Sequence, residues 1–260
     1  MAKPRDDEAP SPDAAHPVLL PHDVEAMKRT QRFLRPLRDS YFRAEVRGME
    51  RAPDGPALYV GNHNGGVFPV DGMFFGMAWH DRFAYERPIY WLMHDVPFHI
   101  HSLLRNWLLG HGCIPASREH LAAAFDRGHG VVVYPGGARE TFRPYTERKK
   151  VTLGDRTGFI AMALRHRVPV VPVVSVGAHE TLIVLTAGRY VGERFFVTRA
   201  LRADVLPVYL GLPWGIAFGP MPHFPLPAKV TLEVLKPIDL ARELNVEREA
   251  DLRDPALMQA

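Results

Sequence analysis

The sequence predicts an α/β fold in which a mixed, largely parallel sheet is flanked by helices. Short segments that are apolar throughout alternate with helical patterns along most of the chain, and strands of that kind are typical of sheets covered on both faces. The chain has 260 residues, of which 47% are apolar and 23% are charged. This length and composition suit one ordinary globular domain better than two.

The first 47 residues divide into two parts. Residues 1–21 are rich in Pro, Ala and Asp and lack the basic start and apolar core of a secretory signal, so we expect a disordered tail. Residues 22–47 place apolar side chains three or four apart with basic residues between them, which predicts an N-terminal amphipathic helical element that Pro36 kinks or divides. Such an element either lies on an anionic membrane surface or covers the core. Residues 22–260 are expected to form a single domain.

The rest of the chain alternates between strands and helices. Strands are predicted at residues 57–60, 88–93, 112–114, 128–134, 169–176 and 229–235. Helices are predicted at residues 69–79, 100–109, 118–126 and 156–167. Ser117 can cap the third of these helices, and residues 135–154 form a long charged loop. Between residue 177 and the last strand the pattern is too weak to assign elements.

Residues 205–228 contain no Asp, Glu, Lys or Arg. A membrane-spanning helix needs about 20 residues of continuous apolar helix, and the six prolines of this stretch would break one. Two interpretations stay open. The stretch forms an apolar loop or short helices that dip into one leaflet of a membrane, or it forms a buried, loop-rich part of the core.

Charge and cysteine content narrow the functional classes. The net charge of +3 and the pI of about 9.1 are compatible with an anionic substrate or an anionic lipid surface. No nucleic-acid-binding motif occurs, so no nucleic-acid partner is expected. The single cysteine, Cys113, cannot form a disulfide within the chain. Its apolar neighbours indicate a buried structural thiol rather than a nucleophile.

The first segment that can carry chemistry runs from Gly61 to Asp71. His63 could remove a proton from a substrate hydroxyl if a partner fixed its tautomer, and Asp71 is a candidate for that carboxylate partner. The segment has no serine or cysteine to act as a nucleophile, which favours direct activation of an acceptor hydroxyl. The alternative is that Asp71 is only an acid in the first turn of a helix and His63 only a turn residue.

Two further segments follow or form buried strands. Residues 134–140 read Tyr-Pro-Gly-Gly-Ala-Arg-Glu. Paired glycines, here Gly136 and Gly137, let backbone N–H groups approach an anion or an oxyanion, and Arg139 offers a guanidinium for phosphate or carboxylate; the alternative is a tight turn with a surface arginine. Residues 168–173 form a strand punctuated by prolines. Ligands of such sheets gather at the carboxyl ends of strands, so we expect these segments to share one site.

Taken in order, these segments resemble the motifs of the glycerolipid acyltransferase superfamily, which includes lysophospholipid, glycerol-phosphate and diacylglycerol acyltransferases. The first motif of that family is Asn-His-x(4)-Asp, its third is Phe-Pro-Glu-Gly-Thr-Arg-Ser, and its fourth is similar to Val-Pro-Ile-Val-Pro-Val. Residues 112–118, Gly-Cys-Ile-Pro-Ala-Ser-Arg, resemble the second motif. The resemblance spans residues 58–176 and implies an α/β acyltransferase domain attached to one face of a membrane.

The segments depart from the family's pattern in two places. Seven residues, rather than four, separate His63 from Asp71. Gly136 stands where the third motif has glutamate, and Glu140 stands where it has its last serine. The sequence Pro-Gly-Gly-x-Arg-Glu looks more like the mono- and diacylglycerol acyltransferase branch and its bacterial relatives. A phosphorylated acceptor is therefore a weaker expectation.

The resemblance implies transfer of a fatty acyl group from acyl-coenzyme A, or from an acyl carrier protein, to a hydroxyl of a glycerolipid or lysophospholipid. His63 and Asp71 would be the catalytic residues, with His63 as general base. The implied substrate-binding residues are Gly136, Gly137, Arg139, Glu140 and Arg118. No metal or other cofactor is implied. The protein would lie at the cytoplasmic face of the cell membrane, peripheral or monotopic, and the excess of Arg over Lys favours a bacterial source.

Three other functions stay open at this point. One is a metal site, because four side chains of metal-ligand type lie close in sequence. They are His94, Asp95, His99 and His101. The second is a thioester or lipid hydrolase, in which His63 and Asp71 would activate water. The third is a non-catalytic lipid-binding protein.

Overall fold

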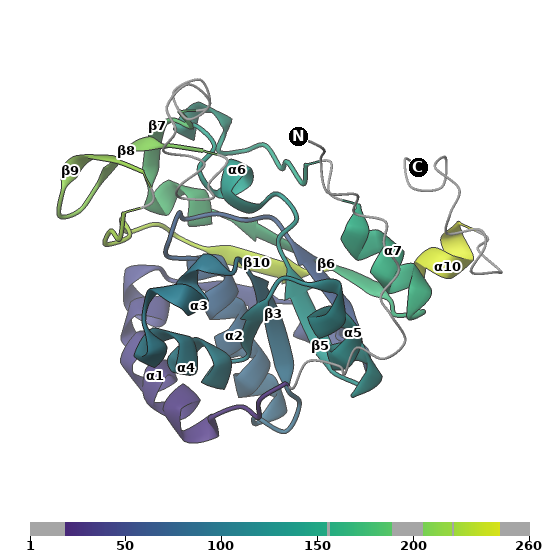
Figure 1. Ribbon diagram of the computed structural model, residues 1–260. Helices are drawn as coiled ribbons and strands as arrows, with labels where there is room; N and C mark the ends of the chain where they lie inside the picture. Colours follow the sequence, from purple (N-terminus) through teal and green to yellow (C-terminus); the bar gives the residue numbers. More distant parts are fainter. Residues whose placement is uncertain (1–18, 155–156, 189–204, 220, 245–260) are drawn as a thin grey trace.

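Figure 1 shows the computed structural model, which describes residues 19–154, 157–188, 205–219 and 221–244. Its main sheet has seven strands in the order β1-β10-β6-β2-β5-β3-β4. The strands are β1 (Glu45–Arg47), β2 (Leu58–Gly61), β3 (Ile89–Met93), β4 (Cys113–Pro115), β5 (Gly130–Val133), β6 (Val170–Val176) and β10 (Thr231–Val234). β10 runs antiparallel to β6, and the other neighbouring strands are parallel. The expected mixed, largely parallel sheet is confirmed.

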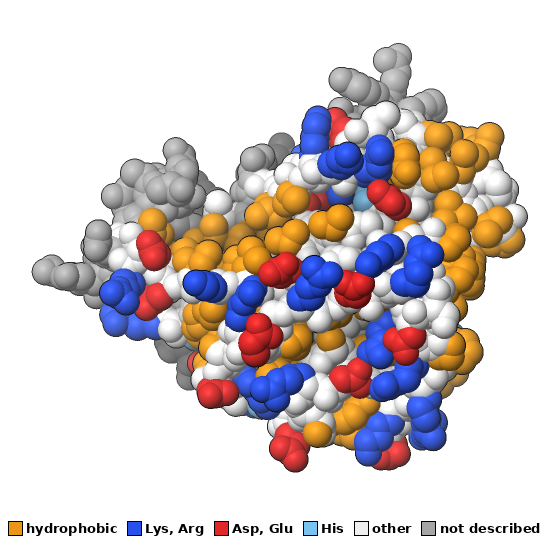
Figure 2. All heavy atoms as spheres, turned by 180° about the vertical axis from the view of Figure 1, so that it is seen from behind, with side chains coloured by type: hydrophobic (Ala, Val, Ile, Leu, Met, Phe, Trp, Pro, Cys, Tyr) orange, Lys and Arg blue, Asp and Glu red, His pale blue; other side chains and the backbone are white. Residues whose placement is uncertain are grey.

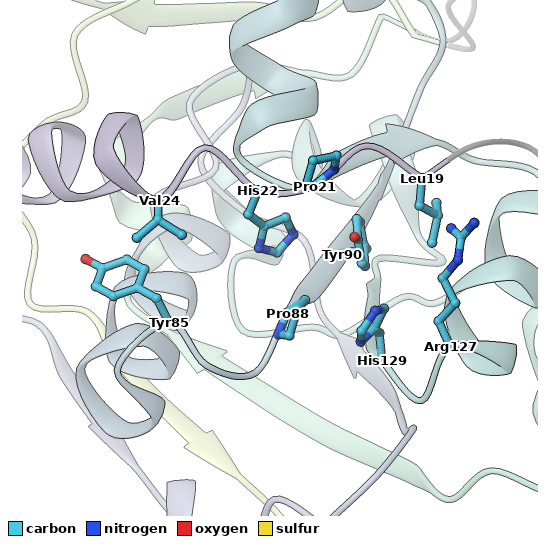
Figure 3. Close-up of a pocket in the computed structure, with 9 residues that line it drawn as sticks. All are labelled: Leu19, Pro21, His22, Val24, Tyr85, Pro88, Tyr90, Arg127 and His129. Atoms are coloured by element: carbon cyan, nitrogen blue, oxygen red, sulfur yellow. The ribbon is translucent and has the colours of Figure 1, made fainter.

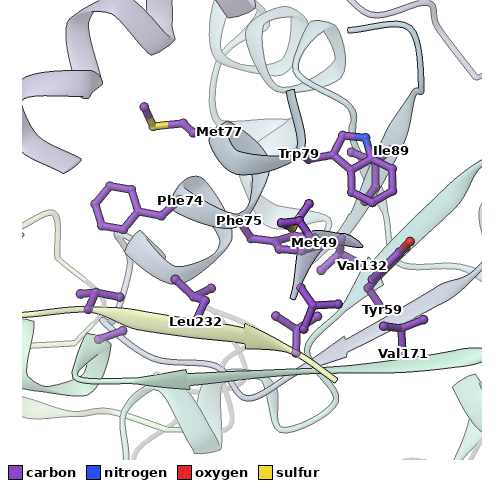
Figure 4. Packing of buried hydrophobic residues seen from close by; sticks show 14 of the residues in the cluster. Met49, Tyr59, Phe74, Phe75, Met77, Trp79, Ile89, Val132, Val171 and Leu232 are labelled. Carbon is purple, nitrogen blue, oxygen red and sulfur yellow. The ribbon is translucent and has the colours of Figure 1, made fainter. Parts of the chain in front are cut away.

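Helices cover both faces of this sheet. They are α1 (Val24–Pro36), α2 (Val70–Phe83), α3 (Val96–Ile100), α4 (Ser102–Gly110), α5 (Arg118–Asp126), α6 (Gly137–Thr141), α7 (Gly158–Arg165) and α10 (Leu240–Glu243). Tyr59 of β2 belongs to the cluster that α2 covers (Figure 4). Its neighbours Leu58 and Val60 belong to the cluster that α5 and α7 cover. Because successive strand residues point to opposite faces, both faces of β2 need apolar side chains.

The N-terminal element is a helix, an irregular turn and an edge strand. Asp23 caps α1, since its carboxylate accepts the Ala26 N–H at 2.9 Å. The α-helix ends at Pro36 and a π-helical turn spans Leu37–Tyr41, which confirms the division at the proline. The expectation that the element is helical through residue 47 is wrong, because β1 extends along β10 and completes the edge of the sheet.

The prediction of a disordered tail through residue 21 is wrong for its last residues, from Leu19 on. Leu19 is buried in the cluster that contains Leu58 and α5. Its apolar side chain therefore already belongs to the core. The rest of the expected tail, residues 1–18, lies outside the described residues.

One helix prediction and one loop prediction need adjustment, and one cap is confirmed. The helix expected at residues 100–109 is α4, and it is separated from α3 by the extended backbone of His101. The ring of His101 accepts the Leu103 N–H at 3.1 Å and so caps α4. Ser117 Oγ accepts the His120 N–H at 3.2 Å, as expected for the cap of α5. The charged loop at residues 135–154 contains α6 and a short 3₁₀ turn, η3 (Tyr145–Glu147).

A second, smaller sheet consists of the antiparallel strands β7 (Ile183–Thr186), β8 (Val208–Gly211) and β9 (Gly215–Phe218). Val184, Tyr209 and Ala217 point from its three strands into a small core that also holds Phe142. Residues 208–218 of the stretch at 205–228 therefore form a hairpin, and residues 221–228 are an irregular segment bridged to it between Leu212 and Phe224. The described part of the stretch forms neither short helices nor a wholly buried loop. No helix among the described residues is long and apolar enough to cross a membrane.

His80 makes the stability of this fold dependent on pH. It lies buried on α2, its two ring nitrogens have no hydrogen-bond partner among the described residues, and its ring stacks on Tyr85 at 4.7 Å. Burial lowers its pKa from 6.5 to about 4. Between these pH values the unfolded chain binds a proton that the folded protein excludes, so the free energy of unfolding falls as the pH falls.

We expect His80→Phe, which keeps an aromatic ring against Tyr85, to weaken this dependence. The variant should lose about 2–4 kcal/mol less of its free energy of unfolding than the wild type between neutral pH and about pH 4. Urea unfolding at the two pH values measures both losses. Equal losses in the two proteins would contradict the assignment to His80.

Candidate active site

The carboxyl ends of β6, β2 and β5, which are neighbours in the sheet, bring the three predicted segments to one edge. Asn62 follows directly after β2 and is buried. Its Nδ2 donates to the Ser175 carbonyl at 2.9 Å, and its Oδ1 accepts the Ser175 N–H at 2.7 Å. These two bonds fix the start of the His63 loop (residues 62–69) to β6.

The ring of His63 rests on Tyr134, the residue that follows β5. The two rings stack with centroids 4.7 Å apart and an interplanar angle of 25°. A Cβ at Gly61 would overlap the Tyr134 ring, and a Cβ at Gly72 would press on its hydroxyl. Because these two positions lack side chains, the Tyr134 ring fits between them. The stacking on Tyr134 then fixes the plane of the His63 ring.

His63 is half-buried. Burial, and after it the positive charge of Arg143, lowers its pKa from 6.5 to about 4. The imidazole is therefore neutral at neutral pH, which is the form that can accept a proton. Its Nδ1 atom is buried and has no hydrogen-bond partner among the described residues.

Asp71 does not hold the His63 ring in this structure. It is wholly buried in the first turn of α2. Its Oδ2 accepts from the backbone N–H of Asn64 at 3.0 Å and from the Asn64 amide at 3.3 Å, and its Oδ1 accepts the Gly72 N–H at 2.8 Å. Burial raises its pKa to about 7. The expected hydrogen bond between the two side chains is wrong, because the carboxylate faces the loop backbone; Asp71 positions the His63 loop.

Glu140 is likewise a structural carboxylate. It is wholly buried, its Oε2 accepts the His63 N–H at 2.8 Å, and its Oε1 accepts the Thr152 N–H at 3.1 Å. Burial raises its pKa. A Cβ at Gly136 would overlap this carboxylate and the Thr152 carbonyl. Gly136 thus makes room for the protein's own carboxylate, which holds the His63 and Thr152 backbone together; that Glu140 also contacts substrate stays a prediction.

The expected oxyanion donors are only partly available. The N–H of Gly137 donates to the Tyr134 carbonyl at 3.1 Å. This bond closes the turn between β5 and α6 and removes the Gly137 N–H from any role toward a substrate. Of the two glycines, only Gly136 can still offer its N–H.

Arg143 is the central residue that sequence reasoning missed. It is 3% exposed, and all five of its side-chain N–H groups donate to protein oxygens. The acceptors are the carbonyls of His63 (3.2 Å), Glu140 (2.9 Å), Glu147 (3.2 Å) and Arg148 (3.0 Å) and the side-chain Oδ1 of Asn64 (2.7 Å). Nothing in the sequence distinguishes it from the other basic residues of the loop at 135–154.

The other predicted residues lie around this centre. Arg139 lies on α6, is exposed and makes contacts of its own. Arg118 is exposed at the start of α5, after β4, and two strands separate it from β2. Both stay predictions as substrate-binding residues. Burial raises the pKa of the Cys113 thiol to about 12, which agrees with a structural role.

Two histidines that the sequence did not single out form hydrogen bonds to the backbone of the site. His179 is buried and donates from Nε2 to the Arg143 carbonyl at 2.9 Å. His223 is buried and donates from Nε2 to the Gly65 carbonyl at 3.2 Å. Through His223 the segment after β9 is tied to the His63 loop.

The metal alternative is not supported. Within the described ranges no three His, Cys, Asp or Glu side chains converge on a point that could hold a metal ion. His94 and His101 instead accept N–H groups at the starts of α3 and α4. These rings therefore serve as local caps.

A cavity of about 350 Å³ lies at the other end of the strands (Figure 3). Its lining includes Pro88, which precedes β3, and Arg127 and His129, which precede β5. These are the amino ends of the strands. The cavity is therefore separate from the candidate active site, which lies at the carboxyl ends.

Comparison with known proteins identifies a family. The model of the family described as diacylglycerol acyltransferase matches residues 31–249. A protein of Mycobacterium tuberculosis of unassigned function is 31% identical over 222 residues, covering 84% of this chain and 58% of its own. This chain thus spans little more than half the length of that relative. Mycobacterial relatives fit the bacterial source that the composition favoured.

Two animal proteins and one solved structure are also similar. The bovine "DGAT1/2-independent enzyme synthesizing storage lipids" is 28% identical over 208 residues, covering 74% of this chain and 55% of its own. Human diacylglycerol O-acyltransferase 2 is 35% identical over 81 residues, which are 30% of this chain and 21% of the human protein. The crystal structure of a 1-acyl-sn-glycerophosphate acyltransferase from Thermotoga maritima has a TM-score of 0.48 and 18% identity, covering 83% of this chain and 68% of its own.

The five hydrogen bonds of Arg143 predict a large cost for its replacement. Lysine keeps the charge but has three donors on one nitrogen and cannot reach five separate oxygens. We expect Arg143→Lys to lower the free energy of unfolding by about 3 kcal/mol or more. Urea unfolding measures it, with Arg118→Lys on the surface as the matched control, expected within about 0.5 kcal/mol of the wild type. Similar stabilities for both variants would refute the central place of Arg143.

Gly136 offers a second test of the same geometry. Alanine there would push the Glu140 carboxylate away from the His63 N–H, so we expect Gly136→Ala to lower the free energy of unfolding by about 2 kcal/mol. Gly158 is the control, because a Cβ there meets nothing within 4 Å and alanine suits the first turn of α7. If both alanine variants unfold at the same urea concentration as the wild type, the close approach is not real.

Proposed function

Because the chain belongs to the diacylglycerol acyltransferase family, we propose that it transfers a fatty acyl group from a thioester donor to a lipid hydroxyl. The donor is acyl-coenzyme A or an acyl carrier protein, and the acceptor is a glycerolipid or a lysophospholipid. The observation that carries this proposal is the neutral, half-buried imidazole of His63, stacked on Tyr134 at the carboxyl edge of the sheet. It is a base held in a fixed orientation.

The chemistry needs few steps. One ring nitrogen of His63 takes the proton of the acceptor hydroxyl while the hydroxyl oxygen attacks the thioester carbonyl. The tetrahedral oxyanion then collapses, the carbon–sulfur bond breaks, and the thiolate takes the proton from the imidazolium. The products are an ester and a thiol. No covalent acyl-enzyme forms, which agrees with the lack of a serine or cysteine in the His63 loop.

Arg143 supports this reaction through its charge. Its five N–H groups are already occupied, so it acts as a fixed cation next to His63 rather than as a hydrogen-bond donor to substrate. A fixed positive charge in a poorly solvated site favours the oxyanion as it develops. Arg139 and Arg118 are proposed to bind anionic parts of the donor or the acceptor, and neither a metal nor another cofactor takes part.

A neutral acceptor is the first choice. Gly136 occupies the position at which the phospholipid branch has glutamate, and its space is filled by Glu140. The names of the animal relatives refer to diacylglycerol acylation and storage lipids. We therefore place mono- or diacylglycerol before a lysophospholipid, and place the protein at the cytoplasmic face of the cell membrane, where such acceptors reside.

The test is transfer by a variant that lacks the base. His63→Gln keeps a side chain of similar size against Tyr134 but cannot accept the proton, so we expect the rate to fall by about 10²- to 10⁴-fold. The rate of transfer is measured by mass spectrometry of the products formed from labelled acyl-coenzyme A. Four acceptors are compared: monoacylglycerol, diacylglycerol, lysophosphatidate and glycerol 3-phosphate. His99→Gln, exposed on α3, is the matched control and should keep the wild-type rate.

Two results would count against the proposal. A His63→Gln variant that retains the wild-type rate would remove His63 from the reaction. Release of free fatty acid by the wild type without an acceptor, at a rate equal to transfer, would favour a hydrolase.

A further inference from the structure

The outer face of the small sheet is apolar, which is unusual for an antiparallel sheet. Such sheets ordinarily bury one face and turn polar side chains to water with the other. Here the residues that alternate with the buried Val184, Tyr209 and Ala217 are apolar as well. They are Ile183, Leu185, Val208, Leu210, Ile216 and Phe218. None of the strands β7, β8 and β9 contains a charged residue.

Four of these six side chains are exposed, and Ile183 and Val208 are half-buried. Ile216 is 60% exposed and Phe218 is 63% exposed. In Figure 1 the β8–β9 hairpin stands at the upper left, and in Figure 2, which is turned by 180°, apolar side chains gather at the upper right over the same hairpin, with Lys and Arg side chains beside them. A contiguous apolar surface of this kind marks an interaction site.

The apolar surface continues to the His63 loop. Leu212, at the turn of the hairpin, pairs with Phe224 through a backbone bond of 2.7 Å. The adjacent His223 contacts Phe68 of the His63 loop ring to ring at 6.4 Å, and Phe68 is itself exposed. The hairpin and the loop that carries the proposed base therefore share one apolar surface.

Two features indicate what covers this surface. Trp214 at the tip of the hairpin is exposed but donates its Nε1–H to the Pro222 carbonyl at 2.6 Å, and amphipathic tryptophans favour the boundary between lipid and water. The basic residues Arg148, Lys149 and Lys150 follow η3, which packs against β7. Basic residues beside an apolar surface suit anionic headgroups.

We propose that the outer face of β7, β8 and β9, together with Trp214 and Phe68, docks on an anionic lipid surface and admits the acceptor to His63 from the bilayer. The acceptor part of this inference rests on the proposed acyl transfer, whereas the docking part does not. Sequence reasoning left contact with one leaflet open for two segments: the stretch at residues 205–228, which supplies β8, β9 and Trp214, and the basic N-terminal helix, which is not part of this surface.

The test compares two pairs of exposed apolar residues. Ile216→Ser/Phe218→Ser removes apolar area from the outer face of β9. The control, Phe33→Ser/Leu103→Ser, removes side chains that are even more exposed (76% and 73%) from α1 and α4. Flotation with vesicles of equimolar phosphatidylcholine and phosphatidylglycerol measures binding. The β9 pair should weaken binding by at least about tenfold, with little change in the control, and circular dichroism confirms that both variants fold.

An activity measurement separates this inference from the proposed function. With diacylglycerol embedded in the vesicles, the β9 pair should transfer acyl groups at least tenfold more slowly than the wild type, and with a short-chain acceptor dissolved in buffer it should match it. A wild type inactive on both acceptors would end the proposed function, while flotation would still decide the docking surface.

Two outcomes overturn the docking surface. One is loss of vesicle binding in the α1/α4 pair with full binding in the β9 pair. The other is a wild-type dimer in sedimentation that the β9 pair abolishes without change in vesicle binding, because a second copy of the chain would then be the occupant.

Discussion

The guanidinium of Arg143 is the contact on which the candidate site depends. It joins three parts of the chain: the His63 loop at His63 and Asn64, the helix α6 at Glu140, and the following segment at Glu147 and Arg148. A single hydrogen bond contributes about 1 kcal/mol net, which is too little to fix a loop. Five that share one rigid, planar group fix it, because a shift of any acceptor loses alignment with a donor that the other four hold in place.

Small residues make this dense arrangement possible. Tyr134 occupies space that side chains at Gly61 and Gly72 would fill, and the Glu140 carboxylate lies against Gly136. The buried charges also depend on each other, since a buried cation is tolerated only when it is compensated. Arg143 has two buried carboxyl groups near it, and burial raises the pKa of both; that of Asp71 reaches about 7.

The sequence predicted the main sheet because β2, β5 and the first half of β6 are largely buried on both faces and so are apolar. It also predicted that their carboxyl ends meet. It missed β1, which has only three residues and so is too short to show a period, and the hairpin β8–β9, where flanking prolines and an apolar outer face hide the period of two. The roles of Arg143 and Asp71 could not be predicted, because Arg143 reaches His63 and Asn64 from about 80 residues further along the chain and the donors to Asp71 are set by the fold of the loop, and no local pattern encodes either. Gly136 was singled out correctly, but its reason, close approach of Glu140, is visible only in three dimensions.

His63 differs from the base of a Ser-His-Asp arrangement in having no carboxylate on its ring. A low pKa would by itself make it a weak base toward an alcohol. Burial lowers this pKa most and the charge of Arg143 lowers it further, and in the proposed reaction the same charge would favour the oxyanion. The oxyanion would in turn offset the effect of Arg143 on the imidazolium, so proton uptake and oxyanion formation would assist each other. A carboxylate hydrogen-bonded to the ring would stabilise the imidazolium even without substrate and would oppose the oxyanion. Asp71 instead faces the loop backbone at Asn64. This position is consistent with a site in which the proposed base gains strength only as the reaction proceeds.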